Sequence, residues 1–310
     1  MVALPQRESQ TVAAIYAAYE AKNRNEFRPH LGCSRIGAQC SRALWYEFRW
    51  ATRPDFEGRM LRLFETGHRE EPRLIANLRA IGVQVHELSP ETGKQWVLSH
   101  GAHIGGSMDG AAVGVPEAPA TWHVLEFKTH SEKSFNALKS KKVQHAKPEH
   151  FAQMQLYMKL SGMTRALYLA VNKNTDELYA ERINYDADTA ARLLEKAEKI
   201  VSASRAPEGV SKDPSFFMCR FCSQSAVCHK DKFAETNCRT CLHSTADADG
   251  WHCAKHDKRL EESEQRLGCA SHLFIPDMVP GEQTDAGEDW VSYKLQDGST
   301  YVDGGEDEAA

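Results

Sequence analysis

The sequence predicts an α/β (α+β) fold, a large domain of helices and strands followed by a small cysteine-rich C-terminal module. Helix-like segments, with apolar residues three and four positions apart, alternate with short strand-like runs bounded by glycine and proline. The 310 residues, 41% of them hydrophobic, suffice for one sizeable core and an appendage. Seven of the nine cysteines lie between Cys219 and Cys269. Clustered cysteines in a cytosolic chain bind metal more often than they form disulfides, which favours a metal-binding module.

Three helices are expected before residue 82. They cover residues 9–23, 41–50 and 58–80, and Gly82 suits the end of the third. Pro72 lies inside this third helix and predicts a kink or a break. Steps of three and four along the helix predict one buried stripe with two polar side chains at its centre. The stripe comprises Leu61, Phe64, His68, Glu71, Ile75 and Leu78.

Strands dominate the middle of the chain, and glycines and prolines separate them as antiparallel turns require. Asp188 is a plausible N-cap for the amphipathic helix that closes this region. In chain order we expect strands 83–88, 95–99, 102–113 and 122–129, helix 149–161, strands 165–172 and 177–185, and helix 188–204.

Charge and hydropathy limit the class of protein. No apolar run approaches the roughly 18–20 residues of a membrane span, and the opening MVALPQRESQ lacks a signal-peptide layout. We therefore expect a cytoplasmic protein without a membrane partner. A net charge of −5 disfavours indiscriminate coating of nucleic acid. A basic stretch after strand 122–129 still favours a phosphate contact, through Lys141 and Lys142, over a merely solvated surface: Lys133, Lys139, Lys141, Lys142, His145 and Lys147.

Acidic residues at the ends of two expected strands form the strongest chemical pattern. Asp109 and Glu126 are spaced as Asp-x16-Glu-x-Lys, ending at Lys128. Glu126 and Lys128 share a strand face, while Phe127 points into the protein. Two carboxylates can hold a divalent cation, Mg²⁺ or Mn²⁺, and a lysine beside them can orient a nucleophile on a phosphodiester. Each residue alone has a plain structural explanation, and only their co-occurrence predicts a site.

Helical residues supply further candidates. His68 would add an imidazole ligand, which favours manganese somewhat, and Glu71 would support that site or face the phosphate. Gln153 and Tyr157 are four residues apart on helix 149–161, with His150 one turn earlier, and therefore share a face. An amide and a phenol together suit a DNA backbone and a stacked base, although such pairs are often ordinary surface residues.

These motifs, in this order, resemble the PD-(D/E)XK nucleases of the RecB-like branch, which includes AddB-type domains and CRISPR-associated exonucleases. The resemblance covers about residues 33–230, and Phe151–Tyr185 also resembles the phage lambda-exonuclease group. It implies a restriction-endonuclease-like core, a central mixed β-sheet flanked by helices. It also implies that His68, Asp109, Glu126 and the Phe127 carbonyl bind metal, that Lys128 is catalytic, and that Gln153 and Tyr157 face DNA.

The first cysteine set, Cys219-x2-Cys222-x5-Cys228, supplies three thiolates and needs a fourth ligand. The resemblance implies a [4Fe–4S] cluster closed by Cys40, whose segment departs from the family pattern in having Trp45 for tyrosine. Cys33 is the competing ligand, and zinc on the same thiolates is the alternative.

The second set is Cys238-x2-Cys241-x11-Cys253-x15-Cys269, a spacing typical of a zinc ribbon-like module. Four thiolates are the simplest ligands, with His256 or His272 as substitutes. The module lies outside the resemblance and would bind DNA or a replication or recombination partner.

The sequence thus predicts three parts: a nuclease domain with an iron–sulfur staple at 1–232, a zinc module at 233–280, and an acidic tail at 281–310 with a hairpin turn at Asp297-Gly298. The expected function is that of a metal-dependent DNA exonuclease, phage- or mobile-element-derived, acting on single strands or duplex ends. The alternatives are a non-catalytic nucleic-acid-binding or assembly protein, which the intact Asp109, Glu126 and Lys128 disfavour, and a structure-specific endonuclease.

Overall fold

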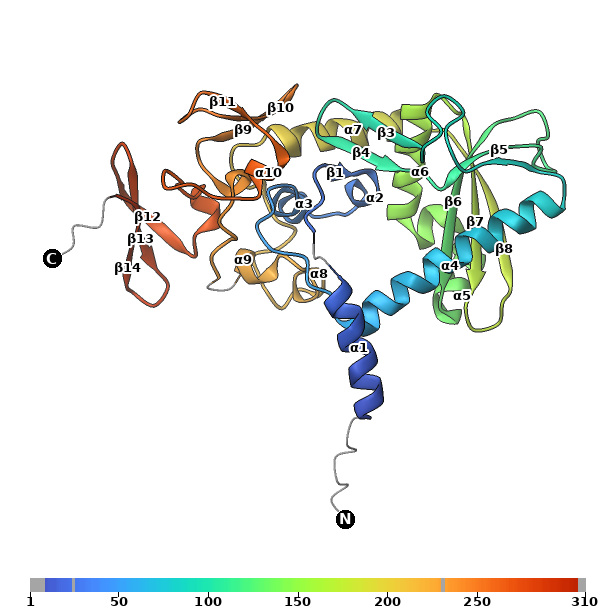
Figure 1. Ribbon diagram of the computed structural model, residues 1–310, viewed down its shortest axis with the longest axis horizontal. Coiled ribbons are helices and arrows are strands. Elements are labelled where there is room, and N and C mark those ends of the chain that lie inside the picture. The colour runs from blue at the N-terminus through green and yellow to red at the C-terminus, as the bar shows by residue number, and fades with distance from the viewer. Residues whose placement is uncertain (1–8, 24–25, 230–231, 306–310) are drawn as a thin grey trace, which may run out of the picture.

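A five-stranded mixed sheet forms the centre of the protein. The computed structural model describes residues 9–23, 26–229 and 232–305 (Figure 1). The sheet has the strand order β2-β5-β6-β7-β8, in which β6 and β7 are parallel and the other pairs are antiparallel. The strands are β2 Gln84–His86, β5 Gly110–Val113, β6 His123–His130, β7 Arg165–Asn172 and β8 Leu178–Asn184. The predicted mixed α/β class is confirmed.

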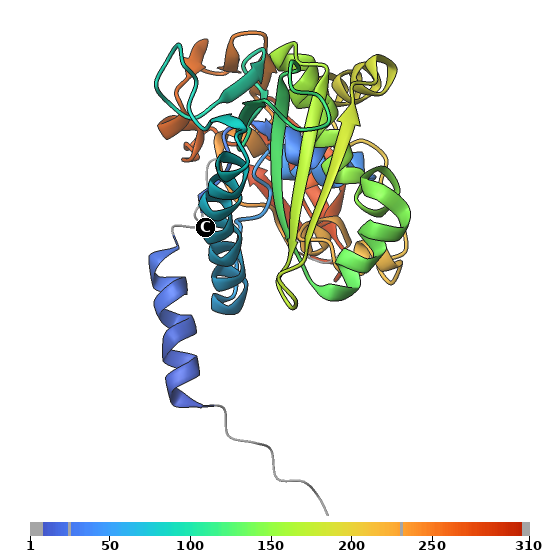
Figure 2. The ribbon, with the colours of Figure 1, turned by 90° about the vertical axis from the view of Figure 1, so that its right-hand side faces the viewer.

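Helices cover both faces of this sheet. On one face, α4 (Gly58–Ala80) packs through Leu74, Ile75 and Leu78 onto a cluster that includes Phe127 of β6. On the other face lie α5 (Glu132–Ala146) and α6 (Pro148–Ser161), with α7 (Ala187–Ser202) beyond α6. Figure 2 shows the sheet between these two layers. Because side chains alternate along β6, Glu126 and Lys128 leave the strand on the face opposite Phe127, the α6 side, and Lys128 also reaches the cavity beside α4.

A second, small sheet lies next to the first, in the order β1-β4-β3. Its strands are β1 Leu31–Gly32, β3 Val97–His100 and β4 Ile104–Ser107, and α2 (Cys33–Ile36) and α3 (Ser41–Phe48) follow β1. The single strand expected at 102–113 is therefore two strands, β4 and β5, belonging to different sheets. The break falls at Met108-Asp109, which places Asp109 in the link between the two sheets.

The helix α4 runs unbroken through Pro72, but its predicted stripe is only half buried. Ile75 and Leu78 are buried, whereas Phe64 is 42% exposed and His68 is also exposed. The expectation of one buried stripe is wrong for its first half. The reason is visible in Figure 1, where the start of α4 leaves the sheet and only α1 (Gln10–Lys22) lies beside it. No residue of α1 is buried.

Two further local features differ from the sequence prediction. The basic stretch forms the helix α5, which the sequence analysis did not delimit, with a break at Lys142 (φ 64°). The N-cap of α7 is Asp186 rather than Asp188, since the Asp186 side chain accepts a hydrogen bond from the Thr189 amide at 3.0 Å.

The C-terminal third consists of short elements. Two three-stranded sheets, β9-β10-β11 and β12-β13-β14, lie here, and the predicted turn at Asp297-Gly298 joins β13 to β14. The elements are α8 Phe217–Arg220, α9 Ser225–His229, η1 Cys238–Thr240, β9 Ser244–Asp247, β10 Gly250–Cys253, β11 Lys258–Leu260, α10 Glu262–Gln265, η2 Pro276–Met278, β12 Gly281–Ala286, β13 Trp290–Leu295 and β14 Thr300–Gly304.

The C-terminal segment packs on the N-terminal one through a shared core. Arg239 is buried and donates to the carbonyl of Pro29 at 2.7 Å and that of Phe48 at 3.0 Å. The buried His103, just before β4, reaches the carbonyls of Asp247 at 2.7 Å and Gly250 at 3.1 Å. The domain division at residue 232 stays a prediction. In the described parts of the chain, no helix is long and apolar enough to cross a membrane.

Candidate active site

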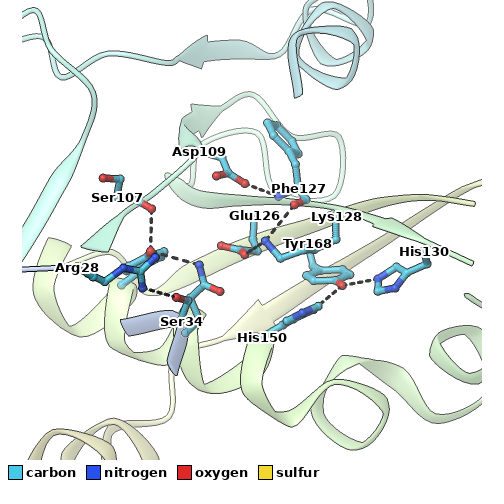
Figure 3. A network of polar contacts seen from close by, with 12 residues as sticks. Arg28, Ser34, Ser107, Asp109, Glu126, Phe127, Lys128, His130, His150 and Tyr168 are labelled. Atoms are coloured by element: carbon cyan, nitrogen blue, oxygen red, sulfur yellow. Dashed lines mark hydrogen bonds and ion pairs between the residues drawn. The ribbon is translucent and has the colours of Figure 1, made fainter. Parts of the chain in front are cut away.

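The candidate site lies where β5 begins, beside β6. The pairing of these strands stops at Gly110 and Leu125, so the next β6 amide that faces this side, that of Phe127, has no β5 partner. The Asp109 carboxylate takes this place and accepts from the Phe127 amide at 2.7 Å (Figure 3). The chain break that the sequence did not predict therefore fixes the first candidate ligand against the second strand.

Glu126 and Lys128 lie on the same face of β6, as predicted. Glu126 is fully buried, its Oε1 accepts from the Lys128 ammonium, and its Oε2 has no hydrogen-bond partner within the described residues. Lys128 also donates to the Phe127 carbonyl at 3.1 Å. A buried carboxylate oxygen without a partner costs free energy in the absence of a ligand. A cation between this oxygen and Asp109 would satisfy it.

The pKa values of the site residues also favour a bound cation. Burial raises the pKa of Glu126 to about 7, opposed by the charge of Lys128 and reinforced by that of Asp109. Burial also raises the pKa of Asp109. Burial alone would lower the pKa of Lys128, but the charges of Glu126 and Asp109 outweigh it, so its pKa is raised. The lysine stays protonated, and a cation bound beside the two carboxylates would favour their ionised form.

The helix α4 forms the outer wall. Burial, and then repulsion from Asp109, raises the pKa of Glu71, whereas the charges of His68 and Lys128 lower it. A cavity of about 330 Å³ opens between α4 and β6. It is lined by Leu63, Phe64, Gly67, His68, Glu70, Glu71, Leu74, Phe127, Lys128, Thr129 and Lys173. His68 thus faces this cavity and not the core.

The residues present fit a magnesium-type site. Across the described residues, no three His, Cys, Asp or Glu side chains are gathered so as to enclose a metal ion. Mg²⁺ does not require this, because it keeps several waters and uses one or two carboxylates. Asp109, Glu126 and the Phe127 carbonyl provide such a set. His68 touches neither carboxylate and influences Asp109 and Glu71 only through its charge.

Residues 5–229 match the family model described as the PD-(D/E)XK nuclease superfamily. The chain belongs to this superfamily. The match covers the predicted motifs and begins before the region of resemblance seen in the sequence. No curated protein matches.

Solved structures similar to this nuclease share little sequence with it. An alkaline exonuclease of Laribacter hongkongensis is 16% identical, with a TM-score of 0.40 over 61% of this chain and 90% of that one. SSO0001 is 14% identical, with a TM-score of 0.43 over 71% and 96%. A phage-related exonuclease of Haemophilus somnus is 15% identical, with a TM-score of 0.32 over 44% and 68%. Similarities at this level carry no argument about activity.

The predicted DNA-facing pair of the nuclease is buried. Tyr157 is 2% exposed and Gln153 is 7% exposed. The Tyr157 hydroxyl donates to the Ser107 carbonyl at 2.7 Å and accepts from the Gln153 amide at 3.2 Å. The expectation that the pair faces DNA is therefore wrong for Tyr157, whose hydroxyl is used inside the protein; for Gln153 it stays a prediction. Lys141 and Lys142 are exposed, and their contact with DNA also stays a prediction.

Sequence reasoning missed a buried network beside Lys128. The Tyr168 hydroxyl lies 2.8 Å from His130 Nε2 and 2.9 Å from His150 Nδ1 (Figure 3). Burial and nearby lysines lower the pKa of His130 to about 4 and of His150 to about 3, which keeps both rings neutral. The residue that could have revealed the network in the sequence is Tyr168, a polar side chain within an apolar strand. The β6–β7 register places it opposite Glu126. The network ties β6, β7 and α6 together beside Lys128.

The first cysteine set converges on one cavity of about 440 Å³, which Cys40, Cys219, Cys222 and Cys228 line together. Backbone amides point at two of the sulfurs, since Ala43 donates to Cys40 at 3.5 Å and Gln224 to Cys222 at 3.4 Å. Such bonds stabilise thiolates that hold a metal or a cluster. Cys33, the competing ligand, is fully buried elsewhere and does not line this cavity.

The second set also lines a single cavity, again of about 440 Å³. Cys238, Cys241, Cys253 and Cys269 contribute to it together with His243, His256 and His272. Burial raises the pKa of Cys238 to about 11, and the neighbouring Cys241, Cys269 and Cys253 raise it further. Four cysteines are a ligand set that a structural Zn²⁺ takes, although within the described residues no three of them are gathered so as to enclose an ion.

Proposed function

We propose that this nuclease is a divalent-metal-dependent DNA exonuclease, acting in phage or mobile-element recombination, repair or processing, in the cytoplasm of a bacterial or phage-infected cell. The observation that carries the proposal is the buried Glu126 Oε2, which has no partner among the described residues and lies beside Asp109 and Lys128. Membership of the nuclease superfamily makes DNA the expected substrate.

The residues would divide the work as follows. Asp109, Glu126 and the Phe127 carbonyl would hold Mg²⁺ or Mn²⁺, with His68 as the fourth predicted ligand. The bound cation would supply an activated water and neutralise the phosphate charge. Lys128 stays protonated at neutral pH and would orient the water or offset charge on the leaving oxygen. Lys141 and Lys142 would contact the strand outside the cavity.

The test compares linear and closed circular DNA with either metal. Wild type should degrade end-labelled linear DNA and leave closed circles intact, whereas an endonuclease would open the circles. Glu126→Gln keeps the shape but loses the charge, and should lower kcat by about 10³-fold or more. Glu195→Gln, an exposed glutamate paired only with Lys199 within α7, is the matched control and should stay active. Full activity of Glu126→Gln, or DNA binding without cleavage by wild type, would contradict the proposal.

We further propose a [4Fe–4S] cluster on Cys40, Cys219, Cys222 and Cys228, and Zn²⁺ on Cys238, Cys241, Cys253 and Cys269. Support comes from the two cavities, each lined by four cysteines. Anaerobically purified protein should be brown and should contain zinc by elemental analysis. A colourless preparation with two zinc ions would assign both sites to zinc. In this proposal the C-terminal module is the docking site for a replication or recombination partner.

A further inference from the structure

An exposed aromatic pair lies beside the cavity between α4 and β6, which Lys128 lines but Asp109 and Glu126 do not. Phe64, which lines the cavity, is 42% exposed, and Phe56 just before α4 is 39% exposed. Their ring centroids are 5.2 Å apart and the rings are nearly perpendicular, at 81°. In this geometry each ring covers at most one face of the other. Two large apolar side chains exposed together on a soluble protein point to a binding surface.

Gly67 adds an independent observation on the same face of α4. It lines the cavity, yet a Cβ built on it would meet nothing within 4 Å in the described part of the chain. Its φ is not positive, so the backbone does not require glycine. Glycine inside a helix costs about 1 kcal/mol relative to alanine. Neither packing nor backbone geometry explains this cost, which is consistent with a ligand that needs the space.

The opposite wall has the complementary chemistry for a nucleotide. Lys128 and Thr129 of β6 and the exposed Lys173, which follows β7, line it. Phe64 precedes His68 by four residues, one helical turn, so both project toward the same cavity. A strand whose phosphate contacts Lys128 and Lys173 would therefore place a neighbouring base in this cavity, beside Phe64.

We propose that Phe64 and Gly67 form a stacking site for an unpaired nucleobase next to the candidate catalytic centre, so that the enzyme takes single-stranded DNA. Gly67 provides the flat floor and Phe64 the ring that stacks, with Phe56 holding that ring. At about 330 Å³ the cavity is at the small end of ligand pockets and suits one nucleotide rather than a base pair. This proposal rests on the proposed function, because it names the substrate of the same site.

The first experiment measures binding without cleavage. Fluorescence anisotropy is recorded for the Glu126→Gln protein with 12-nucleotide single strands, each abasic at one position. Phe64→Ala in this background should weaken binding of the intact strand about 5- to 150-fold, the equivalent of about 1–3 kcal/mol for a stacked base. At one abasic position the penalty of Phe64→Ala should vanish, and Phe64→Trp should bind like the parent.

The matched control is Trp122→Ala. Trp122 is 43% exposed and is partnered by one ring, that of His86 at 5.1 Å, much as Phe64 is partnered by Phe56. It does not line the cavity and should leave binding unchanged. Three results would overturn the stacking site. The loss of affinity caused by Phe64→Ala could be the same at every abasic position, it could equal the loss caused by Trp122→Ala, or it could be as large for blunt duplex as for single strands. An absence of binding to single strands would also overturn it.

The second experiment uses Gly67→Ala, for which stability and affinity should move in opposite directions. The helix should gain stability, with a higher Tm, while KM for single-stranded DNA rises at least fivefold because the methyl group fills the floor. Asn77→Ala on the exposed side of α4 gains similar helix propensity outside the cavity and should raise Tm with KM unchanged. Gly67→Ala with unchanged KM would overturn the floor assignment. Binding by a protein that proves unable to cleave would contradict only the proposed function.

Discussion

The nuclease presents its candidate metal-binding residues in two different settings. Glu126 and Lys128 lie on β6, which is hydrogen-bonded on both sides within the central sheet. The cysteines lie on segments of three to five residues and on loops, such as η1 and α8. The first site is built by backbone pairing before any ion binds, so a metal bound there would serve chemistry rather than folding. Of the second cysteine set, Cys253 alone lies on a strand paired on both sides, β10, while the other three lie on η1, just after it or in a loop, so a metal there would hold these separate segments together.

The largest expected effect separates these roles through the second cysteine cavity. Cys238→Ser should unfold the 233–280 module, because structural zinc supplies on the order of 10 kcal/mol of folding free energy. Circular dichroism should show a lower Tm, and hydrogen exchange should show loss of protection in β10. Cys33→Ala, a buried cysteine outside both cavities, is the control, with an expected Tm change of only a few degrees. An equal decrease in Tm for Cys238→Ser and Cys33→Ala would contradict a structural role for a metal in the second cysteine cavity.

The next effect tests how the module is joined to the nuclease core. Arg239 follows Cys238, stacks 3.6 Å from the Trp50 ring centroid, and donates to the carbonyls of Phe48 and Pro29. Arg239→Met removes these donors and leaves buried carbonyls unpaired, so we expect a loss of about 2–4 kcal/mol in urea unfolding. Arg259→Met, which breaks an exposed pair with Asp247, should cost at most about 1 kcal/mol. A cost for Arg239→Met no greater than that of Arg259→Met would mean that the module folds independently.

The local sequence pattern predicted secondary structure correctly where a segment is buried evenly along its length. It failed where the structure depends on contacts between segments far apart in the chain. The strand Arg165–Asn172 was predicted to the residue, because a continuous apolar run is what a strand buried on both faces needs. The helix α5 was missed, since three lysines stand between its buried Leu138 and Val143 and interrupt the apolar pattern. The burial of Tyr157 could not be predicted, because its hydrogen-bond partner Ser107 is fifty positions away.

The candidate site shows the same division. The identities of Asp109, Glu126 and Lys128 followed from spacing, and the structure brings them together. The split between β4 and β5, which positions Asp109, could not be predicted from spacing. It depends on two sheets that meet only in the folded chain. The exposure of His68 depends likewise on where α4 leaves the sheet.

A smaller effect, on pH dependence, should distinguish the carboxylate site from the cysteine sites. Since burial raises the pKa of Glu126 to about 7, protons compete with the cation below that pH. Activity at subsaturating Mg²⁺ should fall about tenfold per pH unit below 7, and the midpoint should move to lower pH as Mg²⁺ is raised. Without Mg²⁺, the free energy of unfolding should instead rise as the pH falls. A raised carboxyl pKa stabilises the fold below pH 4.5, the unfolded value, and this contribution is lost as the pH rises toward 7. A midpoint independent of Mg²⁺ would exclude Glu126 as a ligand.

The smallest effect concerns Tyr157, whose hydroxyl links α6 to the strand that leads into Asp109. Tyr157→Phe leaves the Ser107 carbonyl without its 2.7 Å donor and should cost about 1 kcal/mol of stability. Ser107 precedes Asp109 by two residues, so a looser β4 end should displace the carboxylate and lower kcat roughly tenfold. KM for DNA should stay constant, because the hydroxyl is buried. Tyr179→Phe, which removes a hydroxyl bound to Glu181 on β8, should change neither constant. A raised KM with unchanged kcat would return Tyr157 to the DNA-contact role that its sequence pattern predicts.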